Sequence, residues 1–298
     1  MKAPKRLQPL IDDGFIDDVM RPLMSGKEAA VYVVRAQGET RCAKVYKEAS
    51  KRSFHNQAEY QEGRKVRNSR QARAMEKRTR YGRREQEEAW QNAEVDALYR
   101  LASAGVRVPQ PHGFIDGVLL MDLVVDADGD AAPRLNDVEL DADEAREFYR
   151  IMLGEIVKML SAGLIHGDLS EYNVLLTPQG PVIIDLPQAV DAAANNNAER
   201  MLTRDVDNMT RYFGRFAPEL LKIDYAGEIW SLFEHGKLHP DVRLTGTFVR
   251  SEERADLDAV MREIDAAKDD RLGRGPADDD NEDGVVEDDE SGDWRPAR

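Results

Sequence analysis

The first half of the chain combines strand-like and helix-like spacing of apolar residues. Short apolar runs at residues 30–34 and 42–46, separated by a glycine-containing turn, predict two β-strands. Apolar residues then recur at helical spacing from about residue 85 to Gly105, which predicts one helix. The apolar stretch 114–125 has the texture of a hairpin of buried strands. This half therefore predicts a small β-rich unit with a single main helix.

The pattern after this unit is longer and more helical. Asp141 followed by Glu144 has the spacing of a capping box, and we expect the helix that it opens to end at Gly163. Two short apolar runs, 174–176 and 182–184, predict two short strands. A loop therefore separates the helix from a strand pair.

From Asn196 to about Lys268 the pattern is helical again. Residues 269–298 are acidic, dotted with Gly and Pro and poor in apolar side chains, so we expect them to be disordered. The order of elements predicts an α+β fold of two lobes, a small antiparallel β-rich lobe and a mainly helical lobe. The two lobes would join near residues 122–125.

Composition and charge narrow the possible classes of protein. The chain has 298 residues, of which 41% are hydrophobic, and a formal net charge of −15. No apolar run is long enough for a membrane-spanning helix, and no apolar segment follows the basic N-terminus as in a signal peptide. The single cysteine, Cys42, excludes an internal disulfide. We therefore expect a cytoplasmic protein that does not interact with membranes.

The strongest chemical signal is the run His166-Gly-Asp-Leu-Ser-Glu-Tyr-Asn173, between the predicted helix and strand. Phosphoryl transfer needs a carboxylate near the attacking hydroxyl and side-chain oxygens that hold Mg²⁺ on the phosphates. Asp168 and Asn173 supply one of each, and Asp185 follows at the end of the next apolar strand. Each of these residues alone would more often be a cap or turn residue. As an ordered set they predict a catalytic loop with a magnesium site.

Two further features upstream fit nucleotide binding. Lys44 lies inside an apolar strand, where its charge is costly unless it is paired. A glutamate from the following helix could pair with it. Glu94 is the main candidate and Glu87 and Glu88 are its rivals; an edge strand with Lys44 in water is the alternative.

The glycine-containing turn just before the predicted strand at residues 30–34 is the second feature. It contains Ser25, Gly26 and Lys27, whose side chains and free backbone N–H groups could cradle phosphates. A single glycine in a hairpin is more often only a turn, so this signal depends on its neighbours.

Four segments together resemble the RIO family of atypical protein kinases. They occur in the family's order, and they are residues 25–32 (SGKEAAVY), 43–47 (AKVYK), 166–173 (HGDLSEYN) and 183–188 (IIDLPQ). The resemblance covers about residues 20–235 and favours the type-one branch, because there is no room for the winged-helix domain of the other well-known branch. It implies an extension at 1–20, a kinase domain at 21–268 and an acidic tail at 269–298. Within that domain it implies an N-lobe at about 21–121, a hinge at about 122–125 and a C-lobe at about 126–268.

The resemblance also implies roles for individual residues. Asp168 would be the catalytic aspartate, Lys44 would bind ATP phosphates, and Asn173 and Asp185 would bind Mg²⁺ or Mn²⁺. Asp185 occupies the position that is implicated in this family as a phospho-acceptor. The remaining ATP-binding residues would be the phosphate-turn residues Ser25, Gly26 and Lys27, the pre-hinge Met121, the hinge residues Asp122 and Val124, and the Lys44 partner Glu94.

Three departures from ordinary protein kinases affect the expected function. The phosphate turn lacks the Gly-x-Gly-x-x-Gly pattern, and Asp185 is followed by Leu-Pro instead of Phe-Gly. The run Ala217-Pro-Glu219 resembles the end of an activation segment, but Pro218 suits the first turn of a helix. RIO proteins lack that segment, so we expect no peptide platform of the usual kind. His166-Gly-Asp also replaces the His-Ala-Asp most common in the type-one branch.

Three functions remain open at this stage. The first is transfer of the ATP γ-phosphate to Ser or Thr of proteins, including the chain itself. The second uses the same residues as an ATPase switch on an assembling small ribosomal subunit or other RNA–protein particle. The third, less favoured, is a small-molecule kinase of the aminoglycoside-phosphotransferase type, which has a similar His-Gly-Asp-Leu run.

The basic segment 51–85 suggests one further partner. It holds 12 Lys or Arg against 4 Asp or Glu, a density that can bind a phosphate backbone. RIO proteins of archaea and eukaryotes act in small-subunit maturation, so the resemblance implies rRNA or a pre-ribosomal particle. A solvated charged helix or mobile segment explains the composition equally well.

Overall fold

The structure is a computed structural model that describes residues 3–26, 28–47 and 80–249, with only the backbone for residues 80–90. These described residues belong to one compact unit. Residues 51–79 of the predicted basic segment 51–85 and the whole predicted acidic tail lie outside the described residues. The predicted domain boundaries therefore stay predictions.

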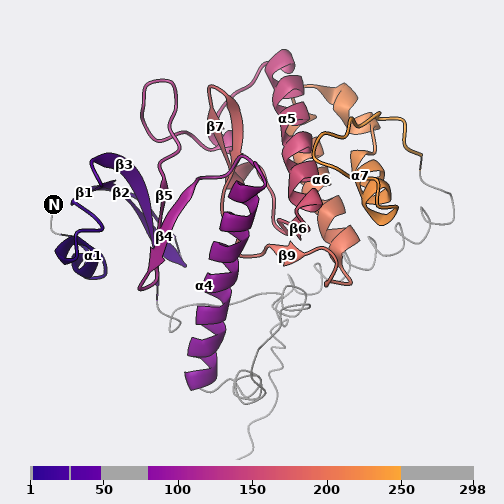
Figure 1. Ribbon diagram of the computed structural model, residues 1–298. Helices are drawn as coiled ribbons and strands as arrows, with labels where there is room; N and C mark the ends of the chain where they lie inside the picture. The colour runs from indigo at the N-terminus through magenta and orange to yellow at the C-terminus, as the bar shows by residue number, and fades with distance from the viewer. Residues whose placement is uncertain (1–2, 27, 48–79, 250–298) are drawn as a thin grey trace, which may run out of the picture. The chain divides into compact units, whose positions relative to one another are not determined.

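The N-terminal sheet has five antiparallel strands in the order β1-β2-β3-β5-β4 (Figure 1). Its strands are β1 (Asp18–Ser25), β2 (Ala29–Ala36), β3 (Glu39–Tyr46), β4 (Pro111–Ile115) and β5 (Val118–Asp122). The two apolar runs and the hairpin predicted from the sequence are strands of this sheet. β3 lies at its centre, so a side chain on β3 is flanked by strands on both sides.

The residues before the sheet are part of the folded lobe. Helix α1 (Gln8–Asp12) and its flanks bury Leu7, Leu10 and Ile16 against the sheet in a small core of their own. The segment expected to be an extension therefore packs on the sheet. Periodicity could not show this, because five residues are too few to display a helical face.

Helix α4 (Arg80–Ser103) is the predicted main helix of the N-lobe, and it begins five residues before Glu85. It ends before Gly105, which adopts a φ of 73°, a left-handed conformation that glycine reaches without strain. Val95, Leu98 and Leu101 bury one face of the helix in the main core. This packing fixes the position of Glu94, next to Val95 on the helix.

Helix α5 (Ala142–Ser161) begins with the predicted capping box. The Asp141 carboxylate accepts hydrogen bonds from the N–H groups of Asp143 and Glu144, both at 2.8 Å, and Glu144 Oε2 accepts from Asp141 N–H at 2.9 Å. The helix ends before Gly163, as predicted, and Gly163 has a φ of 76°.

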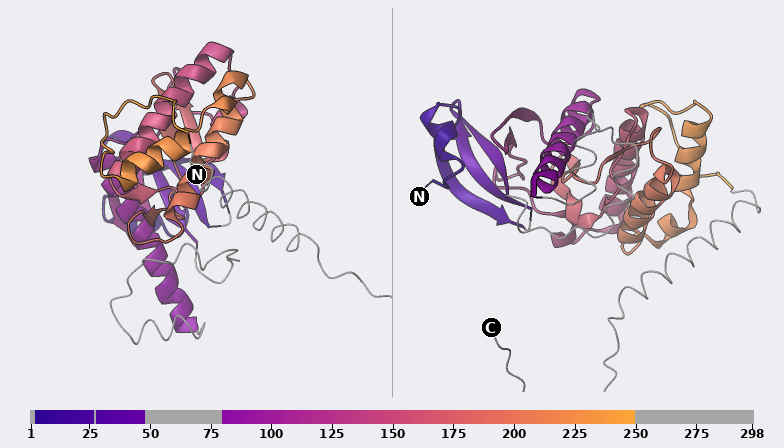
Figure 2. Two further views of the ribbon diagram at one scale, coloured as in Figure 1. Left: turned by 90° about the vertical axis from the view of Figure 1, so that its right-hand side faces the viewer. Right: turned by 90° about the horizontal axis from the view of Figure 1, so that it is seen from below.

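Helices α6 (Ala198–Phe213) and α7 (Tyr225–Glu234) complete the C-lobe, and α5, α6 and α7 lie side by side (Figure 2). The short 3₁₀ helices are η2 (Leu135–Asp137), η3 (Glu171–Asn173) and η4 (Pro218–Lys222). Pro218 stands in the first turn of η4, as predicted. Residues 186–197 alone join Asp185 to α6, which agrees with the missing activation segment.

Two small sheets support the loops between α5 and α6. β7 (Val174–Thr177) pairs with β8 (Gly180–Ile183), as predicted, and β6 (Leu164–Ile165) pairs with β9 (Val190–Asp191). The sequence did not predict β6 and β9, because a two-residue strand leaves no alternation to detect.

The predicted helical stretch to Lys268 is wrong for residues 235–249, which follow α7 without helical structure. Gly236 and Gly246 adopt φ values of 65° and 67°, which a continuing helix cannot contain. The segment is instead held by buried Glu228, whose carboxylate accepts hydrogen bonds from Thr245 N–H at 2.6 Å and Gly246 N–H at 2.9 Å.

Candidate active site

Lys44 links the N-lobe helix α4, through Glu94, to Asp185 in the C-lobe. It lies on the central strand β3, opposite Val31 on β2 and Leu119 on β5. Its Nζ lies 2.5 Å from Glu94 Oε1 and 2.9 Å from Asp185 Oδ1. The alternative of an edge strand in water is wrong, because the Lys44 side chain is only 13% exposed.

Glu94 is the glutamate that pairs with Lys44. It is 4% exposed, and its second oxygen, Oε2, accepts a hydrogen bond from the Tyr46 hydroxyl at 2.8 Å. Burial alone would lower the pKa of Lys44, but Glu94 and Asp185 hold that pKa well above its ordinary value. The lysine is therefore a fixed cation. The other two glutamates considered as partners of Lys44 were Glu87 and Glu88, and their side chains lie outside the described residues.

Asp185 follows β8 with a backbone φ of 65°. This left-handed conformation is uncommon for residues other than glycine and is enriched at functional sites. Burial alone would raise the pKa of Asp185, but the nearby Lys44 ammonium lowers it below the ordinary value. Asp185 is thus held as a carboxylate, with 47% of its side chain exposed.

The catalytic-loop candidates lie beside Asp185. Asn173 Nδ2 donates a hydrogen bond to the Asp168 carbonyl at 2.8 Å, and Asn173 O accepts one from Ile184 N–H at 2.9 Å. The Asp168 side chain reaches solvent, although partial burial still raises its pKa above the ordinary value. The loop therefore presents an accessible carboxylate next to an oriented amide.

His166 holds the catalytic loop in place through two hydrogen bonds. It is 1% exposed, its Nε2 lies 3.1 Å from Ile184 O, and its Nδ1 accepts a hydrogen bond from Asp168 N–H at 3.3 Å. These contacts tie Asp168 to the strand that carries Asp185.

Asp205 on α6 supports the catalytic loop by hydrogen bonds to its backbone. The sequence analysis did not identify this residue. Its carboxylate, 2% exposed, accepts hydrogen bonds from Gly167 N–H at 2.8 Å and Leu169 N–H at 3.0 Å. The neighbouring Arg204 donates to the Gly167 carbonyl. Gly167 has a φ of 82°, so glycine suits the position where the sequence departs from the usual His-Ala-Asp. The signal that could have indicated Asp205 is a carboxylate among the apolar positions of an amphipathic helix.

The phosphate-turn candidates are only partly available as predicted. The Gly26 N–H is not free, because it donates to the Ala29 carbonyl at 2.9 Å and closes the turn. Lys47 Nζ contacts Ser25 Oγ at 3.2 Å and the Gly26 carbonyl at 2.5 Å. The sequence analysis missed Lys47, and Lys27 lies outside the described residues.

Some backbone groups of the predicted hinge residues Asp122 and Val124 are also already hydrogen-bonded within the protein. Asp122 N–H donates to the Gln110 carbonyl at 2.9 Å, and the Val124 carbonyl accepts from Ala132 N–H at 3.0 Å. The prediction of backbone groups for adenine is thereby reduced to the Asp122 carbonyl and the Val124 N–H.

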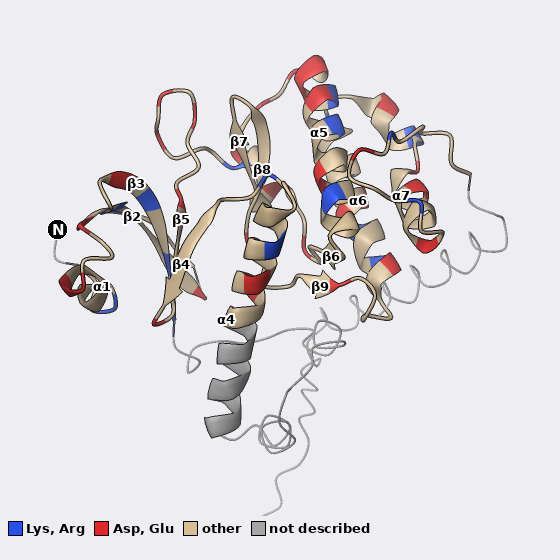
Figure 3. Cartoon of the chain, in the orientation of Figure 1, with Lys and Arg blue, Asp and Glu red and all other residues tan. Residues whose placement is uncertain are grey.

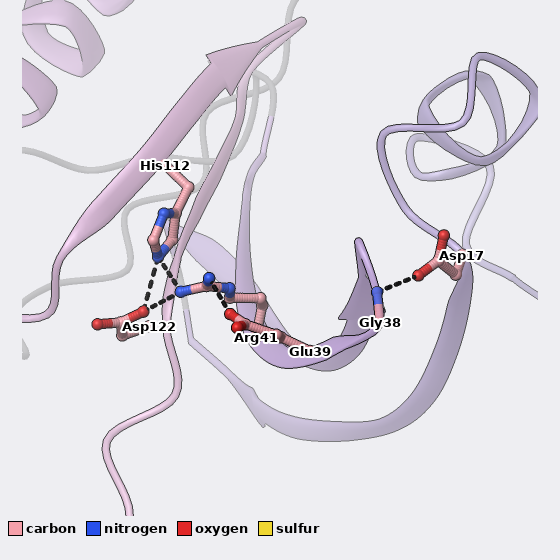
Figure 4. A network of polar contacts seen from close by, with 6 residues as sticks. All are labelled: Asp17, Gly38, Glu39, Arg41, His112 and Asp122. Atoms are coloured by element: carbon pink, nitrogen blue, oxygen red, sulfur yellow. Dashed lines mark hydrogen bonds and ion pairs between the residues drawn. The ribbon is translucent and has the colours of Figure 1, made fainter.

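The Asp122 side chain belongs to a polar network that joins β3, β4 and β5 (Figure 4). Its carboxylate contacts the Arg41 guanidinium, and His112 Nε2 lies 2.6 Å from the same oxygen. Arg41 also pairs with Glu39. These contacts fix the side chain of Asp122 away from a role in the pocket.

A pocket is lined by residues of both lobes. Most of its lining is apolar, and Lys44, Glu94 and Asp185 are its charged members. The lining residues are Lys44, Glu94, Leu98, Pro109, Leu119, Met121, Ile184, Asp185 and Leu186. An apolar pocket with a few convergent charged groups is typical of a nucleotide site.

A family model described as the RIO domain matches residues 30–226. The chain belongs to the RIO family. The RIO-type serine/threonine-protein kinase Rio1 of Haloferax volcanii is 33% identical over 207 residues, which cover 69% of this chain and 67% of that protein. The serine/threonine-protein kinase RIO1 of Homo sapiens is 30% identical over 221 residues, which cover 72% of this chain and 36% of that protein.

These similarities confirm the predicted family, Rio1-like within it, together with the kinase-like fold and the class of ATP-dependent serine/threonine protein kinases. The chain spans about two thirds of the haloarchaeal protein and about a third of the human one, 67% and 36%. A solved kinase domain aligns with a TM-score of 0.41 and 13% identity over 68% of this chain and 63% of that chain, too distant to add to the argument. Among the described helices, none is long and apolar enough to cross a membrane.

Proposed function

We propose that this chain transfers the γ-phosphate of ATP to serine or threonine hydroxyls of proteins, including its own. The observation that carries the proposal is the bridge from Lys44 to both Glu94 and Asp185, at 2.5 Å and 2.9 Å. It joins the central strand, the main helix and the end of β8 in one charged cluster next to the catalytic loop. A phosphotransfer site needs this convergence, because its catalysis comes mainly from positioning and charge.

Asp168 is the proposed catalytic aspartate. Its carboxylate is accessible, and its raised pKa makes it a better proton acceptor than an ordinary aspartate. It would accept the proton of the attacking hydroxyl as the oxygen bonds to the γ-phosphorus and ADP leaves. The hydrogen bonds of His166 and Asp205 to the loop hold it in position for this step.

Asn173 and Asp185 are the proposed ligands of Mg²⁺ or Mn²⁺. The donor set fits, because the Asn173 amide N–H donates to Asp168 O and leaves its own oxygen as a donor atom for a metal. Asp185 is held as a carboxylate by Lys44. Two protein oxygens suffice for a hard cation that also binds phosphate oxygens and water. The metal would neutralise charge on the transferred phosphate.

The nucleotide would occupy the pocket next to Met121. Lys44 would contact its phosphates beside the turn of Ser25, Gly26 and Lys27. The Asp122 carbonyl and the Val124 N–H would meet adenine. The lining of the pocket supports this proposal, because it combines apolar residues, which suit adenine, with the charged Lys44, Glu94 and Asp185, which suit the phosphates and their metal.

We also propose rRNA or a pre-ribosomal particle as a partner, in the cytoplasm, through segment 51–85. Lys and Arg are interspersed with Asp and Glu along α5 and α6 (Figure 3). The proposal is supported by the composition of segment 51–85, which has 12 basic and 4 acidic residues. Most of this segment lies outside the described residues.

The test follows labelled γ-phosphate from ATP to protein, water or small molecules, with Mg²⁺, alone and with RNA. We expect label on protein from the wild type and from Asp96→Asn, an exposed aspartate on α4 that serves as a matched control. Asp168→Asn should reduce transfer to hydroxyls to a small residual rate, and Asp185→Asn should weaken all use of Mg-ATP. Full activity of both variants would refute the site. Label appearing only in water would favour the ATPase, with Asp185 as the candidate phospho-acceptor.

A further inference from the structure

The segment that follows the hinge is fixed against the catalytic hairpin. Leu176 N–H donates a hydrogen bond to the Pro133 carbonyl at 2.9 Å, and Arg134 forms a β-bridge with Leu175. The next residue, Leu135, is completely buried. The backbone of Arg134 therefore has a defined place along β7, although it lies outside the named strands.

This place is close to the proposed metal ligands. β7 begins directly after Asn173, and its partner β8 ends two residues before Asp185. Because Arg134 bridges to β7, one small sheet supports all three residues.

The Arg134 side chain does reach the N-lobe. Its Nη2 lies 3.0 Å from Met24 Sδ, in the residue that precedes Ser25 of the phosphate turn. The Arg134 side chain thus extends from the β7–β8 hairpin to the end of β1, next to the turn between β1 and β2. Its charge also contributes to the lowered pKa of Asp185.

Arg134 has no carboxylate partner in the described parts of the chain. Its side chain is half-buried, and the one hydrogen-bond partner found there is a thioether, which is a weak acceptor for a group with five N–H donors. By contrast, Lys44 is already bonded to Glu94 and Asp185. Arg134 is therefore a cation between β7 and Met24 whose remaining N–H donors are available to an anion.

We propose that the Arg134 guanidinium binds phosphate oxygens of the nucleotide, as a second cation beside Lys44. The inference rests on the proposed function and deepens it by assigning a further phosphate ligand. A planar guanidinium can donate two parallel hydrogen bonds to a phosphate, which suits a position between the turn and the metal ligands. Arg134 would then also draw the two lobes together when ATP is bound.

The test compares Arg134→Gln with Arg150→Gln, a matched control on the exposed face of α5. Affinities for ATP, ADP and adenosine are measured by calorimetry on the full chain with Mg²⁺. We expect Arg134→Gln to weaken ATP binding by roughly tenfold, the effect of one lost hydrogen bond to a charged group, and to leave adenosine affinity unchanged. The ATP affinity of Arg134→Lys should lie between those of the wild type and Arg134→Gln, because lysine keeps the positive charge but cannot donate two parallel hydrogen bonds.

The outcomes separate this inference from the proposed function. If the wild type fails to bind ATP or to transfer phosphate, the proposed function fails. If the wild type binds ATP and Arg134→Gln binds it as tightly as Arg150→Gln does, the proposed function stands and the role of Arg134 is refuted. Equal losses for ATP and adenosine would also refute it, because they indicate a purely structural role.

Discussion

Tyr46 donates its hydroxyl proton to Glu94 Oε2 across 2.8 Å, and so occupies the carboxylate oxygen that Lys44 does not contact. Both side chains are almost fully buried, and the Tyr46 ring packs edge-on against Phe114 with ring centres 6.0 Å apart. Tyr46 and Lys44 stand two residues apart on β3, on the same face of the sheet. The glutamate is therefore held at both oxygens by one strand.

This relationship predicts that Tyr46 positions Glu94 for catalysis. Tyr46→Phe keeps the ring and removes only the hydroxyl, so Glu94 keeps the Lys44 contact but loses a donor in a buried site. We expect a loss of about 1–2 kcal/mol in the free energy of unfolding. We also expect a several-fold rise in the KM for ATP, because the Lys44 ammonium is less firmly placed. Denaturant unfolding and steady-state kinetics check the two effects.

Tyr99→Phe is the matched control, because Tyr99 lies on α4 and is 39% exposed. It should change neither quantity. If Tyr46→Phe loses stability but keeps the wild-type KM for ATP, the hydroxyl is structural only and does not position the lysine pair.

A second prediction concerns the support of the catalytic loop by Asp205. In Asp205→Asn one carboxylate oxygen becomes an NH₂ group, which faces the N–H of Gly167 or Leu169 as donor against donor. We expect a loss of about 1–3 kcal/mol in stability, since a buried backbone donor is left without an acceptor. We expect kcat to fall while the affinity for ATP stays near the wild-type value, because the loop carries Asp168 and the nucleotide pocket is formed elsewhere.

ATP binding and turnover, measured on the same preparation of Asp205→Asn, distinguish a loss of kcat from a loss of affinity for ATP. The same substitution at the exposed Asp96 is the control and should leave both unchanged. An unchanged kcat in Asp205→Asn would show that Asp168 does not depend on the buried carboxylate.

The sequence predicted those parts of the site that lie in continuous patterned segments. Lys44 stood out because a charge within an apolar strand needs a partner, and the 166–173 run stood out by its polar spacing. The capping box of Asp141 and Glu144 also fixed the start of α5 correctly. In each case a local rule and the tertiary fold impose the same conclusion.

The parts that the sequence did not predict depend on contacts between distant segments. Asp205 is 36 residues from Leu169, and Arg134 is 110 residues from Met24, so no local spacing connects them. The Gly26 N–H was expected to be free, but the geometry of the turn bonds it to Ala29. Which polar group is satisfied by which partner is decided by the packed structure.

A third prediction uses the raised pKa of Asp168. Only the ionised carboxylate can accept the proton of the attacking hydroxyl, so kcat/KM should fall as the pH decreases through the Asp168 pKa. Partial burial raises that pKa above 3.8, the ordinary value for aspartate. The acid limb of the pH profile should therefore lie above the range of an ordinary aspartate. Residual activity of Asp168→Asn should lack this limb, and an unchanged limb would assign it to another group.

A fourth prediction concerns the pH dependence of stability that arises from Asp185. Its folded-state pKa is lowered below 3.8 chiefly because Lys44 outweighs the effect of burial. A lowered pKa means that the unfolded chain binds a proton more readily than the folded chain does. The ion pair therefore stabilises the fold fully above the ordinary pKa, and this contribution is lost as the pH falls through the folded-state pKa. Asp185→Asn should be less stable than the wild type near pH 7, and the difference should shrink as the pH falls below the ordinary aspartate pKa toward the lowered folded-state pKa.

Asparagine is a suitable replacement at this position, because it tolerates the left-handed backbone that Asp185 adopts at a φ of 65°. The substitution thus removes the charge without adding strain. Denaturant unfolding at a series of pH values gives the difference, with the exposed Asp18→Asn as a control that should follow the wild type throughout. A stability difference that stays constant from neutral to acidic pH would show that Asp185 contributes through packing or its backbone conformation, and that its charge pair with Lys44 contributes nothing measurable.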